Sequence, residues 1–182
     1  MPKRQLPPVA SIVRSFPVLG IMRLAATRDG LTSLAPAGAD EEDAQDSGIT
    51  AEDLAGMEMV LRAAEKELQE YLAGKRETFS VPIDMQGTAF QKRVWQELLR
   101  IPYGCTLTYG GLAERIGGKH LARAVGQAAG KNNLPIFIPC HRLTGQNEQI
   151  GGFSLFCKDV GGPTLKKRLL ALEDKTLLSV GS

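Results

Sequence analysis

Residues 108–129, TYGGLAERIGGKHLARAVGQAA, carry the strongest indication of how the second half of the chain is organised. Thr108 is placed to cap a short helix that ends at Ile116, because a threonine hydroxyl accepts a hydrogen bond from the first helical turn. The glycine pair 117–118 then interrupts the chain, and a second helix is expected over 119–129. Two helices joined by a short glycine turn form the outline of a helix-turn-helix, although many helical hairpins are merely part of a core.

The second of these helices combines basic side chains at its start with small side chains along the rest. Lys119, His120 and Arg123 lie near its first turn, and alanines and glycines keep it slim. Such a helix fits closely into a nucleic-acid groove, and it packs equally well against a neighbouring helix. Around it, residues 91–142 carry eight basic side chains and two acidic ones. This local excess favours a polyanionic partner.

The charge of the whole chain divides between its two halves. The net charge is +2, which combines −4 over residues 1–80 with +6 over residues 81–182. A basic half beside an acidic half suggests that the second half binds a polyanion. Two domains with unrelated surface charges would give the same numbers, so charge alone does not separate these interpretations.

The first half predicts a small α/β unit. Apolar segments 20–27 and 31–34 flank the Asp-Gly pair at 29–30, which predicts a β-hairpin. The acidic run 38–48 has no apolar periodicity and is expected to form a mobile loop. Apolar residues then recur at helical spacing from 50 to 73.

Length and composition limit the class of protein. The 182 residues suffice for one ordinary domain or two small ones. Hydrophobic residues make up 43% and charged residues 23%, which is ordinary for a soluble globular protein and excludes a disordered chain or a collagen. No apolar run approaches the roughly 20 residues that cross a bilayer, and no signal peptide is apparent. We therefore expect no membrane partner.

The three cysteines suggest a reducing compartment. Their number is odd, which suits free thiols and an intracellular location, in the cytoplasm or, in a eukaryote, the nucleus. None of them has the paired spacing of a zinc site, so we assign no metal, and we expect no cofactor.

The candidate chemistry lies in Cys140-His141-Arg142, directly after the apolar segment 134–139. We expect that segment to be extended, and a thiol at the end of a buried strand is usually inert. An adjacent imidazole and guanidinium, however, favour the thiolate, which is the nucleophilic form. Because neighbouring residues of an extended chain point to opposite sides, His141 is expected to act on Cys140 through a water.

These residues resemble the O6-alkylguanine-DNA alkyltransferases, a family of direct-reversal DNA repair proteins. The resemblance covers a little under half of the chain and consists of several segments in family order. They are IPCHR at 138–142, FQKRVW at 90–95, IPYG at 101–104, TYGGLA at 108–113, ARAVG at 122–126, GGFS at 151–154 and LLALE at 169–173. The resemblance implies an α/β N-terminal domain, a small antiparallel sheet plus a helix, over residues 1–82. A mostly α C-terminal domain with a winged-helix-like helix-turn-helix would follow over residues 83–182.

The activity implied by the resemblance is single-turnover repair. Cys140 would irreversibly accept the alkyl group, typically methyl, from O6-alkylguanine that is flipped out of DNA, with O4-alkylthymine as a further candidate substrate. His141 would take the thiol proton through a water, Glu173 would polarise His141, and Asn132 would brace the active-site turn. We place Glu173 at the end of its helix, where a negative charge opposes the helix dipole. Tyr109 would contact the rotated phosphate and donate to the base.

The same resemblance implies residues that contact double-stranded DNA in its minor groove. They are Arg123, which would fill the space left by the flipped base, together with Tyr109, Ala122, Lys119 and Arg142. The pocket for the flipped base would consist of Pro135, Leu143, Phe153 and Ser154. Phe153 stands where the family often has tyrosine, and the segment 155–163 is unusually long for a pocket lid. We expect the protein to act as a monomer.

Three other functions remain open from the sequence. One is a non-catalytic lesion-recognition protein of the same fold, whose known members lack the acceptor cysteine. Another is a thiol hydrolase that uses Cys140, His141 and Glu173. The last is a DNA-binding regulator in which the thiol is incidental or senses redox state.

Overall fold

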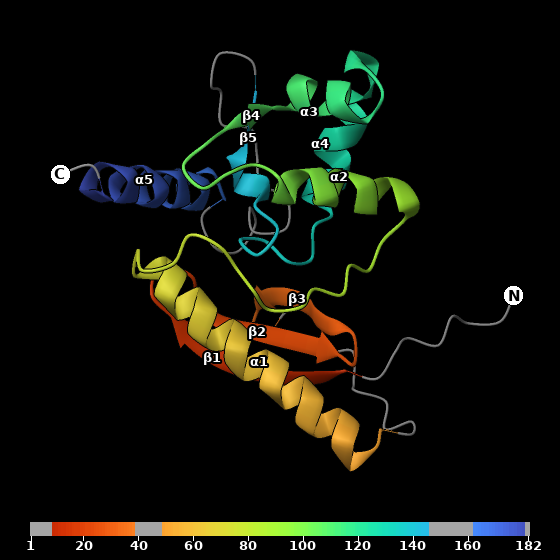
Figure 1. Cartoon of the computed structure of the whole chain (residues 1–182), viewed down its shortest axis with the longest axis vertical. Helices are drawn as coiled ribbons and strands as arrows, with labels where there is room; N and C mark the ends of the chain where they lie inside the picture. The colour runs from red at the N-terminus through yellow and green to blue at the C-terminus, as the bar shows by residue number, and fades with distance from the viewer. Residues whose placement is uncertain (1–8, 39–48, 146–161, 181–182) are drawn as a thin grey trace, which may run out of the picture.

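The computed structural model of the chain describes residues 9–38, 49–145 and 162–180 (Figure 1). It forms two parts, with a sheet and one long helix on one side and the remaining helices on the other. Phe153, Ser154, the segment 155–161 and residues 39–48 of the acidic run lie outside the described residues. The expectations for them therefore stay predictions.

The N-terminal part contains an antiparallel sheet in the order β1-β2-β3. Its strands are β1 (Ala10–Phe16), β2 (Gly20–Thr27) and β3 (Gly30–Pro36). The hairpin between β2 and β3 confirms the prediction from the Asp-Gly pair. Strand β1 was not predicted, because its mostly half-buried and exposed side chains give no clear alternation. It pairs along its whole length with β2.

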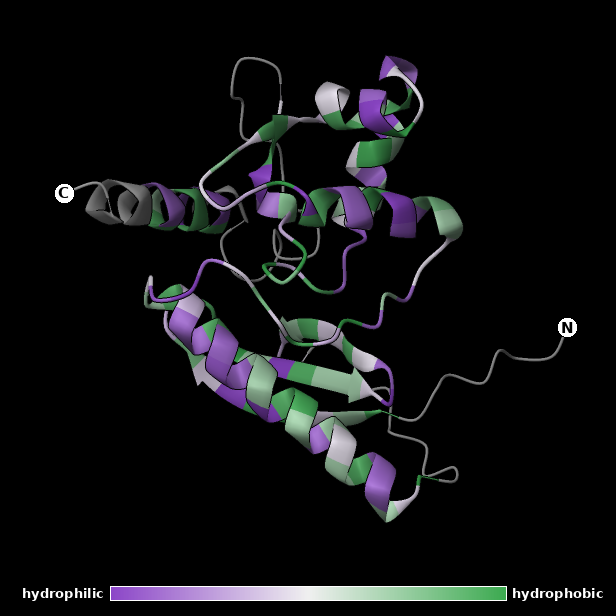
Figure 2. Ribbon diagram, viewed as in Figure 1, coloured by the Kyte–Doolittle hydropathy of each residue, from purple (hydrophilic) through white to green (hydrophobic). Residues whose placement is uncertain are grey.

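Helix α1 (Ala51–Leu72) covers the sheet and confirms the helix predicted over 50–73. Its start is fixed by a capping box between Thr50 and Asp53, which satisfies backbone donors of the first turn. Hydrophilic and hydrophobic residues alternate along its ribbon (Figure 2), as expected of an amphipathic helix. The fully buried face comprises Met57, Leu61, Ala64, Leu68 and Tyr71.

The segment after α1 returns to the sheet before entering the second part. Leu31 N donates to Pro82 O at 2.8 Å, and Asp84 N donates to Leu31 O at 2.9 Å. Gly30, with φ of +144°, lies so close to this segment that a Cβ would come within 2.5 Å of Pro82 O. Only glycine fits there. The domain boundary expected at 82/83 falls inside this hydrogen-bonded stretch and stays a prediction.

The C-terminal part is mostly helical. Its elements are α2 (Ala89–Leu99), β4 (Leu107–Thr108), α3 (Tyr109–Ile116), the 3₁₀ turn η1 (Lys119–Leu121), α4 (Ala122–Gly130), the 3₁₀ turn η2 (Cys140–Arg142), β5 (Leu143–Thr144) and α5 (Gly162–Val180). The helix-turn-helix is present as α3 and α4, with Thr108 capping α3 as predicted. The second helix differs in that its first turn is the 3₁₀ element η1. The parallel pairing of β4 with β5 was not predicted.

Helix α5 corrects one sequence expectation. Glu173 lies in the middle of this helix, which continues to Val180, and not at its end. The argument that its charge opposes the helix dipole therefore fails, since that effect is confined to the terminal turns. None of the helices in the described ranges is long and apolar enough to span a membrane.

Candidate active site

The turn that carries Cys140 differs from the expected extended segment. Ile138 N donates to Leu134 O at 2.8 Å, Ile136 has a positive φ of 76°, and Cys140 begins the 3₁₀ turn η2. The apolar, proline-bounded composition resembles that of a strand, but the backbone hydrogen bonds here are local. The prediction of an extended segment was wrong.

Asn132 holds this turn together from inside the fold. Its Nδ2 donates to Ile138 O at 2.9 Å and to Cys140 Sγ at 3.1 Å, and its Oδ1 accepts from Leu134 N at 2.9 Å. All three contacts are buried, where an unmet polar group is costly. The amide thus fixes the turn and also places an N–H donor against the sulfur, which favours the thiolate.

The Cys140 thiol is poorly ionised by itself. Only 9% of the residue is exposed, and this burial raises the pKa of the thiol to about 11. The hydrogen bond from Asn132 and the charge of Lys166 oppose the rise without cancelling it. At neutral pH the resting group is therefore a thiol, and its use as a nucleophile requires a base.

The pairing of His141 with Glu173 can supply such a base. His141 Nε2 lies 2.8 Å from Glu173 Oε1, and both side chains are completely buried. Burial on its own would raise the pKa of Glu173, but the hydrogen bond from His141 and the hydrogen bonds and charge of Arg142 lower it to about 2. The carboxylate is therefore ionised and can only accept.

The tautomer of His141 follows from this contact. Because Glu173 accepts, Nε2 must carry a proton. Burial lowers the pKa of His141 below its ordinary value, which the pairing with Glu173 only partly opposes, so the ring is neutral at pH 7. Nδ1 then bears the free lone pair, and it has no hydrogen-bond partner among the described residues. It is the basic atom of the site.

Arg142 does not lie where the sequence analysis placed it. It is 6% exposed, with Nη2 donating to Glu173 Oε1 at 2.9 Å, Nε at 3.1 Å from both carboxylate oxygens, and Nη1 donating to Ile101 O at 2.6 Å. A guanidinium committed to a buried carboxylate is not available to a phosphate. Arg142 is therefore left out of the proposed DNA contacts. Its charge in the sequence did not show which partner neutralises it.

Three further residues of the site were missed by the sequence analysis. The hydroxyl of Tyr71 donates to Glu173 Oε1 at 2.7 Å, and Gly104 N donates to Oε2 at 3.0 Å. Lys166 is 1% exposed, and its Nζ donates to Leu143 O. Tyr71 lies on the buried face of α1, where its spacing is that of a core residue.

The expected DNA-contact residues gather on the helix-turn-helix. Arg123 and Lys119 are exposed, Lys119 with an ion pair to Glu114 at 3.2 Å, while Ala122 is half-buried. Tyr109 begins α3, and its ring would lie 3.7 Å from a Cβ at Gly126 of α4. The small residues of α4 thus also serve helix packing, the alternative that the sequence left open.

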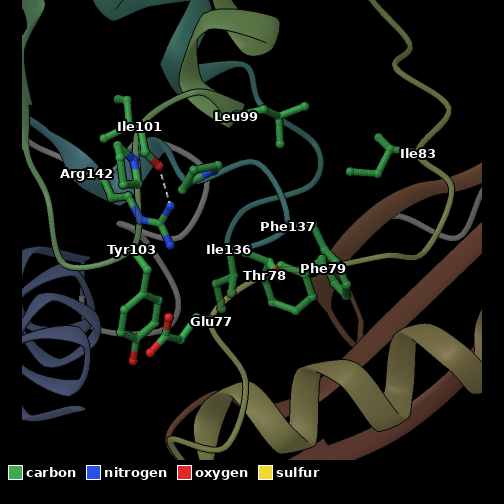
Figure 3. Close-up of a pocket in the computed structure, with 12 residues that line it drawn as sticks. Glu77, Thr78, Phe79, Ile83, Leu99, Ile101, Tyr103, Ile136, Phe137 and Arg142 are labelled. Carbon is green, nitrogen blue, oxygen red and sulfur yellow. Dashed lines mark hydrogen bonds between the residues drawn. The ribbon is translucent and has the colours of Figure 1, made fainter. Parts of the chain in front are cut away.

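A cavity of about 170 Å³ lies behind the active-site turn, between the two parts of the molecule (Figure 3). Phe79 and Glu77 line it from the N-terminal part, and Phe137, Tyr103 and Arg142 line it from the other. Neither of the described residues expected to line the base pocket borders this cavity. Those residues, Pro135 and Leu143, are both buried elsewhere in the same region.

An Asn132→Asp variant tests the contact to sulfur. Aspartate keeps the acceptor for Leu134 N but turns a charged acceptor toward Cys140 Sγ, which disfavours the thiolate. We expect the pKa of Cys140 to rise further by about one unit. Alkylation of Cys140 by iodoacetamide at pH 8 should then slow about tenfold, because the thiolate fraction falls by that factor. Mass spectrometry of the Cys140 peptide measures the rate. Asn133→Asp, an exposed neighbour, is the control; equal rates in the two variants would contradict the assignment.

Comparisons with known proteins agree across both parts of the chain. The family model described as "6-O-methylguanine DNA methyltransferase, DNA binding domain" matches residues 89–175. The model of the "6-O-methylguanine DNA methyltransferase, ribonuclease-like domain" matches residues 13–85. Together the two models account for most of the chain.

Individual relatives support the same assignment. The constitutive methylated-DNA–protein-cysteine methyltransferase of Bacillus subtilis is 50% identical over 94 residues, which cover 52% of this chain and 57% of that relative. The methylated-DNA–protein-cysteine methyltransferase of Archaeoglobus fulgidus is 43% identical over 108 residues, 59% of this chain and 71% of that relative. The crystal structure of Mycobacterium tuberculosis OGT in complex with DNA matches with a TM-score of 0.72 and 33% identity, covering 92% of this chain and 93% of that one.

Proposed function

Because the chain belongs to the 6-O-methylguanine DNA methyltransferase family, we propose that it repairs alkylated DNA by moving an alkyl group from O6 of guanine to Cys140 Sγ. The observation that carries this proposal is the buried group of Cys140, His141 and Glu173, in which the residue that follows the thiol is an imidazole held by a carboxylate. The relatives named above are methyltransferases of the same kind. A non-catalytic lesion-binding protein is not favoured, because binding a lesion without chemistry would not require Cys140 together with the His141–Glu173 pair.

The chemistry balances without any cofactor. The thiol proton passes through a water to His141 Nδ1, and the resulting thiolate attacks the alkyl carbon. The S–C bond forms as the C–O6 bond breaks, and the guanine leaves with the electron pair. Tyr109 supplies a proton toward the departing base. Because a thioether offers no good leaving group, each molecule reacts once and Cys140 stays alkylated.

Access to the lesion requires the nucleotide to leave the stack, at a cost of a few kcal/mol. We assign the helix-turn-helix to the minor groove, where the slim helix α4 carries the exposed Arg123 toward the duplex. Arg123 fills the space that the base vacates. Of the residues expected around the flipped base, we keep Pro135 in the proposal, whereas the carbonyl of Leu143 already accepts from Lys166. Phe153 and Ser154 lie outside the described residues.

The protein acts as a monomer in this proposal, because one chain supplies every residue of the site. O4-alkylthymine is a second candidate substrate. The nucleophile must stay reduced before it meets a lesion, which places the protein in a reducing, intracellular compartment.

Transfer of radiolabel tests the proposal. The protein is incubated with a duplex that carries O6-[³H-methyl]guanine, and the label is followed in protein and DNA. We expect one methyl group per protein molecule, located on the Cys140 peptide by mass spectrometry. Label that stays on the DNA, or turnover beyond one equivalent, would overturn it.

An Arg123→Ala variant tests base flipping. Losing the side chain that fills the vacated space should slow repair of duplex DNA by about tenfold. In free energy, this loss is only part of the few kcal/mol that flipping costs. Reaction with free O6-benzylguanine, which needs no flipping, should stay at the wild-type rate. Arg100→Ala removes another exposed arginine and serves as the control. Equal slowing with both substrates would contradict the role of Arg123.

A further inference from the structure

Tyr71 is the only described residue outside the C-terminal part that donates to Glu173. Tyr71 is the second-to-last residue of α1, in the N-terminal part, yet its hydroxyl oxygen is 2.7 Å from Glu173 Oε1. The hydroxyl oxygen of Tyr71 also lies 3.3 Å from His141 Nε2. The Tyr71 hydroxyl therefore contacts both His141 and Glu173, the two residues proposed to activate Cys140.

The direction of each hydrogen bond is fixed by the chemistry of the groups. A phenol has one proton, and the ionised Glu173 can only accept, so the Tyr71 proton points to Oε1. The Tyr71 oxygen is then left as an acceptor beside the Nε2 proton of His141. Tyr71, Glu173 and His141 form a closed triangle of contacts that restrains the imidazole ring.

The position of Tyr71 is itself rigid. Its ring is completely buried, 5.3 Å from the centroid of Phe79 and 6.0 Å from that of Tyr103, which it meets edge-on. One turn earlier, the buried Glu67 accepts from Ser80 N at 2.8 Å and from Val81 N at 3.3 Å. These contacts tie the end of α1 to the segment that follows it. Such a fixed hydroxyl can hold its partners in place.

We infer that Tyr71 is a positioning residue of the alkyl transfer, through which the N-terminal domain orients His141 and limits the basicity of Glu173. The inference rests on the proposed function. It implies that the two domains form one catalytic unit, because the C-terminal part alone would lack one donor to its buried carboxylate. The hydroxyl itself never touches the reacting atoms.

The expected effect on pH dependence has a definite sign. Around His141 lie Glu173 and Lys166 on α5, Tyr71 on α1, and Cys140 and Arg142 in η2. Removing the hydroxyl takes a short hydrogen bond away from Glu173, whose charge then stabilises the imidazolium more strongly. The pKa of His141 therefore rises, and the neutral base is lost at a higher pH than in the wild type.

The test compares Tyr71→Phe with the wild type and with Leu61→Ala. Leu61 is buried on the same face of α1, near its middle, so its loss destabilises the helix without touching Glu173. The single-turnover rate of methyl transfer from an O6-methylguanine duplex is measured from pH 5 to 9. For Tyr71→Phe we expect the acid limb to move up by about one pH unit and the plateau rate to fall about fivefold. Leu61→Ala should keep the wild-type midpoint.

A second readout is independent of transfer. NMR titration of the labelled His141 ring gives its pKa directly in each protein. An upward shift in Tyr71→Phe that is absent from Leu61→Ala supports the inference. An unchanged midpoint, or the same shift in both variants, overturns it and leaves Tyr71 a packing residue. A wild type that transfers no methyl group would overturn the proposed function, while the titration would still decide whether Tyr71 sets the basicity of His141.

Discussion

A Cys140→Ser variant is expected to transfer no detectable methyl group, a loss of at least about 1000-fold. The serine hydroxyl is a far weaker acid than a thiol, and the neutral His141 is too weak a base to ionise it in a buried site. The side chains are nearly the same size, so the turn held by Asn132 should stay intact. Single-turnover transfer from an O6-[³H-methyl]guanine duplex measures the loss.

Two controls isolate the chemistry from folding and binding. Cys105→Ser changes an exposed free cysteine and should leave transfer at the wild-type rate. Cys140→Ser should bind the lesion duplex with wild-type affinity, because the DNA-contact residues are untouched. Residual transfer by Cys140→Ser at more than a few per cent of the wild-type rate would assign the acceptor to another residue.

A Glu173→Gln variant is expected to lose both stability and activity. Glutamine has nearly the same shape but no charge, so the buried Arg142 loses its counterion, and breaking such a pair costs about 3–5 kcal/mol of unfolding free energy. The uncharged amide also no longer fixes the proton on Nε2 of His141. We expect the transfer rate to fall by about 100-fold to 10,000-fold, the usual contribution of a positioned base.

Urea denaturation and single-turnover kinetics measure the two effects of Glu173→Gln. The matched control is Glu58→Gln, which removes an exposed carboxylate paired with Arg62 at 3.6 Å and should change stability by less than about 1 kcal/mol. A Glu173→Gln protein that unfolds at the same urea concentration as Glu58→Gln would contradict the buried-pair argument.

The pH dependence of stability provides a further check on the same variant. Folding lowers the pKa of Glu173 from its ordinary 4.5 to about 2. Its contribution to stability is therefore complete above pH 4.5 and disappears as the pH falls toward 2. The stability difference between the wild type and Glu173→Gln should accordingly shrink over that range, and a constant difference would assign the loss to another cause.

Local features of the chain were predictable from sequence. The hairpin between β2 and β3, the helix α1 and the helix-turn-helix depend on turn residues, caps and apolar spacing that lie within a few residues of one another. The extended form predicted for 134–139 failed for the opposite reason. Its apolar, proline-bounded composition fits a strand, but the side chain of Asn132 offers the backbone a turn instead.

The candidate site was only partly visible in the sequence. The motif at Cys140 and His141, and the resemblance that pointed to Glu173 and Asn132, named the residues that the structure brings together. They did not show that Arg142 faces inward. In a sequence, an arginine that binds phosphate and one that neutralises a buried carboxylate look the same, because the difference lies in what packs around the charge.

By itself, then, the sequence determined the local elements and the family, and it predicted the nucleophile. Tertiary structure alone decided the protonation state of the site and the full set of donors to Glu173. Arg142 and Tyr71 stand 31 and 102 residues from that carboxylate along the chain. Contacts over such separations depend on how helices and domains pack, and burial, which sets the pKa values of Cys140, His141 and Glu173, exists only once that packing is complete.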